Sequence, residues 1–306
     1  MLKFIGWRFG RALLTVFAVL VAVFLAARLT GNPLDVMYPD GLPPDQEQRL
    51  LVQYGLDKTV PEQFVNYVRD LFQGNFGISL REKRPVADMY AEDIGATLKL
   101  AGCAFLLSVV FGIPMGMIGA LKRRTGAGRL VMSVAFLGYA VPHFIIALSL
   151  ILIFGFYLHW LPSTGNATIW HYILPTITLA AHRFASIARH TRSSLLDVLS
   201  QDFMRTARAK GLEERVVIFK HAMRNSLIPV VTILGLQIAG LINGSIIVET
   251  VFSWPGIGRL FVGAVMKRDF PVLQFGVICF ATIVVLVNFM VDILYVIIDP
   301  RIRTEA

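Results

Sequence analysis

One short basic stretch has residue types and spacing that suit a docking surface. It reads Arg205-Thr-Ala-Arg-Ala-Lys-Gly211 and is followed by a histidine and a proline, His221 and Pro229. The run Phe203–Lys210 favours a helix, and a glycine at position 211 suits its C-terminal end. We take the following as candidate docking residues: Arg205, Thr206, Ala207, Arg208, Ala209, Lys210, Gly211, Leu212 and His221.

Small residues within this stretch predict a close approach by another protein. Ala207 and Gly211 are four residues apart, so one helix face would be nearly bare backbone. Arg205, Arg208 and Lys210 would surround that face with positive charge, which sets the orientation of a partner. The sequence therefore predicts a docking helix.

A second short helix is expected after this glycine, from Glu213 to near Arg224, so that both helices lie at the membrane surface. The alternative is a basic loop held down by anionic membrane lipid. Such a loop needs basic residues, but it needs neither small residues four apart nor a glycine stop. The pattern favours docking to a protein.

Catalytic chemistry has little support in the sequence. No HExxH or G-x-S-x-G motif occurs, and no paired carboxylates flank a predicted pocket. The chain also lacks the G-x-x-x-x-G-K-[ST] loop that cradles nucleotide phosphates. We therefore expect no enzyme activity, no metal site and no cofactor bound by this chain.

Composition predicts that these residues are positioned by membrane-spanning helices. Of the 306 residues, 56% are hydrophobic and only 16% are charged, against roughly 25% in soluble domains. A membrane span needs roughly 20 apolar residues. The sequence predicts an all-α polytopic membrane protein with six spans: Leu13–Leu29, Thr97–Leu121, Val131–Leu158, Tyr172–Ile187, Leu227–Val248 and Val272–Ile297.

The distribution of positive charge predicts the orientation of the spans. With both termini in the cytoplasm, the inner segments hold 18 of the 29 lysines and arginines and six of the 20 acids. Such an inner excess is the usual signature of membrane topology, so the net charge of +9 does not indicate nucleic-acid binding. A cleaved signal peptide is the alternative for the first span, but it would invert this charge asymmetry.

The spans divide the chain into four predicted parts. Residues 1–29 form the cytoplasmic N-terminus and first span, and residues 30–96 form a small helical insertion in the periplasm. Residues 97–297 form the core of five spans. The docking stretch lies in this core, within a segment at 190–226 that we call the coupling segment. Residues 298–306 form a cytoplasmic tail. The insertion is expected to pack on the helix ends, or alternatively to touch a delivered substrate or its carrier.

Polar residues inside the predicted spans are further candidates. Four of them lie along the fifth span and are candidates to line a path, with close helix packing as the alternative: Gln237, Asn243, Ser245 and Glu249. Asn288 and Asp292 are four residues apart on the last span, and ionisable residues at such depth are often functional. A role in helix packing is the alternative for this pair.

The basic stretch and its surroundings resemble a known family. Arg205–Gly211, then nine residues, then His221-Ala-Met-Arg-Asn-Ser-Leu-Ile-Pro229 is similar to the inner loop of binding-protein-dependent ABC importer permeases. The resemblance is greatest to the dipeptide/oligopeptide/nickel branch. Further matching stretches are Gly31-Asn-Pro33, Arg189–Ser194, Glu249–Gly258, Val291–Tyr295 and Asp299–Arg303. The general permease pattern begins Glu-Ala-Ala, where this chain has Arg205-Thr206-Ala207.

The resemblance implies a type I importer in the bacterial inner membrane. This chain and a second, homologous permease subunit would form the pathway for di- or oligopeptides. Two cytoplasmic ATPase subunits, which carry the ATP and Mg²⁺, would dock on the coupling segment, and a periplasmic binding protein would deliver the substrate. Glutathione, nickel chelates, opines and oligosaccharides are alternative solutes, and an ion-coupled secondary transporter is the alternative from another class.

Overall fold

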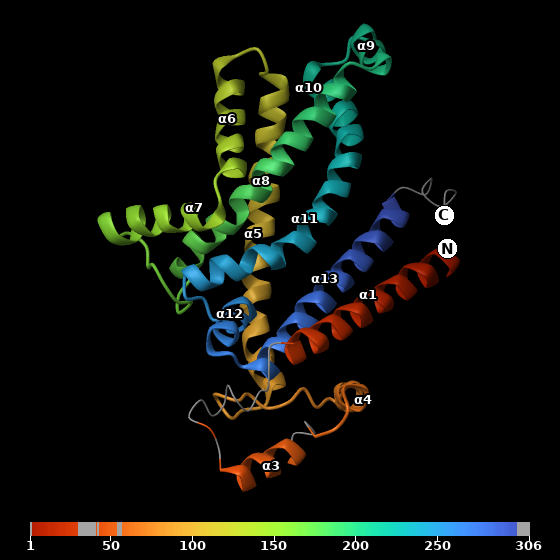
Figure 1. Ribbon diagram of the computed structural model, residues 1–306. Helices are drawn as coiled ribbons and strands as arrows, with labels where there is room; N and C mark the ends of the chain where they lie inside the picture. The colour runs from red at the N-terminus through yellow and green to blue at the C-terminus, as the bar shows by residue number, and fades with distance from the viewer. Residues whose placement is uncertain (1, 30–40, 42, 54–56, 299–306) are drawn as a thin grey trace.

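The computed structural model describes residues 2–29, 41, 43–53 and 57–298 (Figure 1). Every regular element in these ranges is a helix, which confirms the predicted all-α class. Residues 30–40 and the tail from residue 299 lie outside the described residues. Two predicted stretches, Gly31-Asn-Pro33 and Asp299–Arg303, therefore have no structural counterpart here.

Three helices of the described chain are long and apolar enough to cross a membrane unaided. They are α1 (Leu2–Leu29), α5 (Val86–Leu121) and α13 (Phe270–Ile298). The number rises to five if each of two sharply bent helix pairs counts as one span. The predicted fourth span is not among these, because polar residues such as His182 and Arg183 interrupt its apolar sequence.

The third predicted span is sharply bent at Pro142, a residue at which a kink is expected. The segment forms α6 (Gly126–Ala140), then α7 (His143–Leu150) continuing into the π-helical η1 (Ile151–Tyr157), with a bend of 107° between them. Pro142 causes the break, because proline disfavours helical conformation in the residue before it. Val141 is accordingly extended, with φ −87° and ψ 126°.

The central helix, α8 (Trp170–Leu199), packs along α5 over small residues. A Cβ added at Gly112 would lie 2.9 Å from the Cβ of Ile187, and one at Gly116 would lie 2.5 Å from the carbonyl oxygen of Ala188. The glycines therefore let the two helix backbones approach closely, as small residues do between membrane helices.

The C-terminal half crosses this central pair. Helix α11 (Met223–Val251) packs on α8 and bends by 50° where Pro229 interrupts it. The short helix α12 (Ile257–Lys267) follows α11 and precedes α13. Helices α13 and α1 lie side by side (Figure 1).

Two short helices form at one end of the molecule, far from the coupling segment. They are α3 (Pro44–Gln53) and α4 (Val60–Phe72), in the predicted periplasmic insertion (Figure 1). The rings of Phe64 and Tyr67 in α4 lie 5.2 and 5.7 Å from the ring of Phe24 in α1. Part of the insertion therefore packs on the end of a membrane helix.

Candidate functional site

The coupling segment lies at the opposite end of the molecule from α3 and α4 (Figure 1). It contains α9 (Asp202–Ala209), α10 (Glu214–Val216) and the π-helical η2 (Val217–Ala222). Gly211 has φ +76°, a left-handed conformation that favours glycine, so the predicted helix stop is confirmed. The predicted end near Arg224 is wrong, because α10 and η2 run without a break into α11.

The inner face of α9 is buried, which corrects the predicted bare docking face. Met204 and Ala207 are 0% and 7% exposed, and they share a core cluster with Leu195 of α8 and Met223 of α11. Ala207 is thus small because α9 packs against its own chain there. A Cβ at Gly211 would meet no atom within 4 Å, so this glycine serves the turn rather than a packed surface.

The outer face of α9 and the turn after it carry the exposed candidates. These are Arg205, Thr206, Arg208, Ala209, Lys210, Gly211 and Leu212. Apolar side chains of the coupling segment are exposed too: Phe203 of α9 is 38% exposed, Leu212 of the turn 40%, and Phe219 of η2 61%. Sequence reasoning missed both phenylalanines, although large aromatic residues within a basic surface helix are a usable signal for a protein interface.

One predicted docking residue, Arg208, forms an ion pair within the chain. The guanidinium of Arg208 donates two hydrogen bonds to the carboxylate of Glu214, at 3.1 and 3.0 Å. This pairing lowers the pKa of Glu214 below its ordinary value. Arg205 lies 3.6 Å from Asp202, and His221 is half-buried. Lys210 therefore remains as an exposed cation without an ion pair among the described residues.

The four path candidates of α11 have different surroundings. Asn243 is exposed, and Gln237 is half-buried between Arg183 and Ser186 of α8. Ser245 and Glu249 are 0% exposed. These last two cannot line a path in this conformation, because they face the packed interior of the chain.

Glu249 is a buried hydrogen-bonding centre between helices. Its Oε1 accepts from the hydroxyl of Thr97 in α5 at 2.8 Å. Its Oε2 accepts from the backbone N–H groups of Gly258 and Arg259, at 2.7 and 3.2 Å. A carboxylate at this place satisfies N–H groups that the first turn of α12 leaves free. A Cβ at Gly256 would lie 2.5 Å from Oε2, so only glycine fits the turn.

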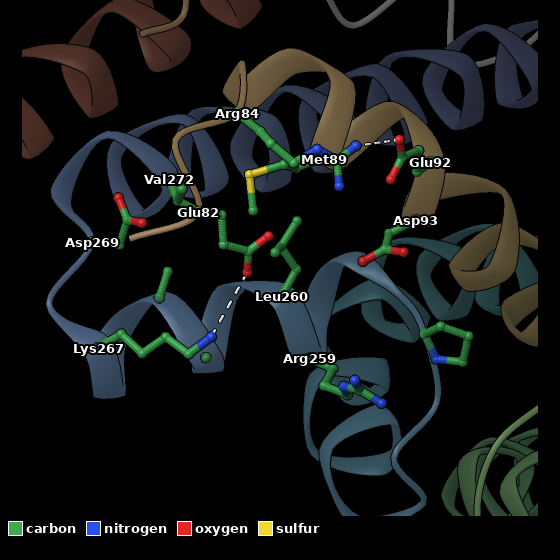
Figure 2. Close-up of a pocket in the computed structure, with 13 residues that line it drawn as sticks. Glu82, Arg84, Met89, Glu92, Asp93, Arg259, Leu260, Lys267, Asp269 and Val272 are labelled. Atoms are coloured by element: carbon green, nitrogen blue, oxygen red, sulfur yellow. Dashed lines mark hydrogen bonds and ion pairs between the residues drawn. The ribbon is translucent and has the colours of Figure 1, made fainter. Parts of the chain in front are cut away.

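A polar cavity of about 300 Å³ lies beside this centre (Figure 2). Within it, Arg84 pairs with Glu92 at 2.5 Å, and Lys267 with Glu82 at 3.7 Å. Asp269 lies at one end, where its carboxylate accepts from the hydroxyl of Ser79 and the N–H of Leu80. The cavity wall thus mixes both signs of charge, and hydrogen bonds fasten the loop before α5 to the start of α13. The charged lining residues are Glu82, Arg84, Glu92, Asp93, Arg259, Lys267 and Asp269.

Asn288 and Asp292, the polar pair of the last span, have different surroundings. Asp292 accepts a hydrogen bond from Arg8 of α1 at 2.5 Å, and this ion pair is only partly exposed. Asn288 is exposed on α13. The carboxylate within the predicted span is therefore neutralised by a neighbouring helix. No group of three or more histidines, cysteines or acids within the described ranges has the arrangement of a metal site.

Comparison with known proteins finds a matching family and relatives that are similar along the whole chain. Residues 112–304 match the family described as the binding-protein-dependent transport system inner membrane component. The glutathione transport system permease protein GsiC of Escherichia coli (strain K12) is 42% identical over 304 residues, which covers 99% of each chain. The protein of the same name in Shigella dysenteriae serotype 1 has the same identity and coverage.

Two solved transporters share the fold. The MetNI methionine ABC transporter, in inward facing conformations, matches with a TM-score of 0.59 and 17% identity over 69% of this chain and 96% of the other. An amino acid ABC transporter with histidines matches with a TM-score of 0.53 and 16% identity over 68% and 94%. At such identities the likeness concerns the fold alone.

Proposed function

Because this chain belongs to the family of binding-protein-dependent inner membrane transport components, we propose that it is the subunit that forms half of an ATP-driven pathway for short peptides. The observation that carries the proposal is 42% identity, along almost the whole chain, to permeases named for glutathione transport. Glutathione is a tripeptide, so a permease of this similarity is expected to carry a small peptide. A second, homologous permease subunit would complete the pathway.

We assign the docking of an ATPase subunit to the exposed face of α9 and the turn that follows it. Arg205 and Lys210 supply positive charge there, while Phe203 and Leu212 supply apolar contact. An interface that combines an apolar centre with a charged rim is typical of protein docking. Two ATPase subunits would bind ATP and Mg²⁺, and each would contact one permease subunit.

Packing provides the mechanical connection from this face to the membrane. Met204 and Ala207 of α9 lie in one buried cluster with Val198 of α8 and Met223 of α11. Because packed interiors deform little, a displacement of α9 would move the inner ends of both helices with it. ATP-driven closure of the ATPases would in this way shift the permease between inward-facing and outward-facing states.

The docking assignment is tested by adding bulk to the exposed face alone. Ala209 is exposed on α9, so Ala209→Trp is expected to leave the core intact and to block the partner. The matched control is Gly126→Trp, at another exposed inner position where a Cβ meets no atom within 4 Å. We expect A209W to lose co-purification of the ATPases and to lower ATP-dependent uptake at least about tenfold, as interface hot spots do. Normal co-purification and uptake by A209W would refute the assignment.

The substrate class is tested by uptake of labelled glutathione into liposomes that hold the complete transporter with its binding protein. Excess unlabelled di- and tripeptides are expected to compete, whereas nickel chelates and oligosaccharides are not. Uptake should persist when the proton gradient is collapsed while ATP is maintained. Loss of uptake under that condition would support ion-coupled transport instead.

A further inference from the structure

Several polar side chains gather in the membrane region where α6, α7, α8 and α11 meet. Arg183 and His182 lie on α8, and His143 is the first residue of α7. The ring of His182 stacks on Tyr139 of α6 with 4.4 Å between ring centroids, and it lies 5.6 Å from the ring of His143. Three groups that can carry positive charge are thus brought together by the bend before α7.

The chain holds the guanidinium of Arg183 in one position. Its Nη1 donates to Oε1 of Gln237 at 2.8 Å, and its Nη2 donates to the carbonyl oxygen of Gly240. The amide nitrogen of Gln237 in turn donates to Oγ of Ser186 at 2.8 Å. A Cβ at Gly240 would lie 2.6 Å from Nη1, so the absence of a side chain there makes room for the guanidinium.

No counter-charge for Arg183 is present in the part of the chain that the structure describes. Helices α6 and α7 contain no acid, and the one acid of α8 is Asp197, 14 residues away or about 21 Å along the helix. Glu249, the acid of α11, accepts hydrogen bonds from Thr97 and from the backbone of α12 instead. Burying a cation without a partner is costly, particularly within a membrane.

Two nitrogen atoms of this cluster also make no hydrogen bond within the described residues. Nε of Arg183 and Nε2 of His143 are buried without a hydrogen bond among the described residues. The absence of a side chain at Gly244 brings the backbone of α11 close to both groups, because a Cβ there would lie 3.7 Å from Nη2 of Arg183, 3.9 Å from Nε2 of His143 and 3.1 Å from Cδ1 of Leu179. The cluster therefore combines a guanidinium that has no ion pair among the described residues with two buried nitrogen atoms that make no hydrogen bond there.

We infer that Arg183, together with His143, binds a carboxylate from outside this chain, and that during transport this is a carboxylate of the peptide substrate. Guanidinium groups match carboxylates in charge and in hydrogen-bonding geometry, which makes arginine well suited to this role. Every ordinary peptide with a free C-terminus supplies such a group. The inference rests on the proposed peptide transport, and it adds a recognition site within the permease to that of the binding protein.

The test uses the complete transporter in liposomes, with its binding protein saturated with glutathione. Arg183→Gln removes the charge, Arg183→Lys keeps it, and Arg129→Gln removes an exposed cation from α6 as a control. We expect R183Q to lower glutathione uptake about tenfold or more, R183K less, and R129Q not at all. Assembly with the second permease subunit should be unchanged in all three.

A second measurement separates recognition from a structural role. Excess glutathione is expected to raise the thermal unfolding midpoint of the purified wild-type permease pair, since a ligand stabilises the state that binds it. The same excess should give no rise for R183Q. If R183Q is absent from the membrane, R183K is the variant that tests the inference. Its uptake of glutathione is expected to fall about threefold, because lysine lacks the forked N–H donors of the guanidinium.

The remaining outcomes show whether the carboxylate that Arg183 binds belongs to the substrate, belongs to the second permease subunit, or does not exist. If R183Q loses the second permease subunit while R183K keeps it, the carboxylate belongs to that subunit rather than to the substrate. Normal uptake and normal assembly by R183Q would overturn the inference. If the wild type hydrolyses ATP but takes up no glutathione or competing peptide, the proposed substrate class fails, and the assembly measurement alone then decides the role of Arg183.

Discussion

Replacement of Glu249 tests whether one buried carboxylate joins α5, α11 and α12. Glu249→Gln preserves shape and one acceptor oxygen, which can still face the N–H groups of Gly258 and Arg259. The amide nitrogen would then face the hydroxyl of Thr97, which can accept from it. The losses are the acceptor of the Thr97 hydroxyl proton and the strengthening that a charged acceptor gives to its hydrogen bonds. We expect about 1–2 kcal/mol of destabilisation.

Glu249→Ala should cost much more, because it leaves all three donors without their acceptor in a site that is 0% exposed. Each unsatisfied buried donor costs about 1–3 kcal/mol, so the variant should lose about 3 kcal/mol or more. The assay is the thermal unfolding midpoint of the purified chain in detergent. Thr250→Val is the matched control, since Thr250 is exposed and bonds only to its own helix.

The order wild type and T250V, then E249Q, then E249A is the expected result. A midpoint for E249A equal to that of T250V would refute the reasoning, because it would mean that the buried N–H groups find other acceptors at no cost. A midpoint for E249Q as low as that of E249A would show instead that the negative charge itself, rather than the acceptor oxygen, is what the site requires.

Three further predictions follow from helix contacts. Gly116→Val should destabilise the chain by about 1–3 kcal/mol because its Cβ would lie 2.5 Å from a backbone oxygen, whereas Gly102→Val on the same helix, with open space around it, should have little effect on the unfolding midpoint. Asp292→Ala should release α1, seen as faster proteolysis near the N-terminus, and exchanging this acid with Arg8 should restore protection. The exposed ion pair of Glu214 should contribute about 0.2–1 kcal/mol. Because the pKa of Glu214 is lowered in the folded state, this contribution is complete above the unfolded-state pKa and is lost as the pH falls through the lowered value. A spin label in the turn between α9 and α10 would report the loss as greater mobility.

Local signals in the sequence were sufficient for the class of protein and for much of its helix plan. Apolar runs marked α1, α5 and α13, because burying backbone groups in lipid requires helices of that length. Gly211 marked the end of α9, because its backbone conformation is one that glycine adopts without strain. The proline at 142 was a visible kink signal, yet the 107° bend made two helices of one predicted span.

Only the tertiary structure decided which polar residues face a partner and which face the chain itself. Ala207 was predicted to be bare and is packed, and Glu249 was a candidate to line a path and is enclosed. Arg183 meets Gln237 across 54 residues of sequence, and Arg8 meets Asp292 across 284. Such pairings depend on how whole helices cross, and no periodicity within a single helix specifies the neighbour against which it packs.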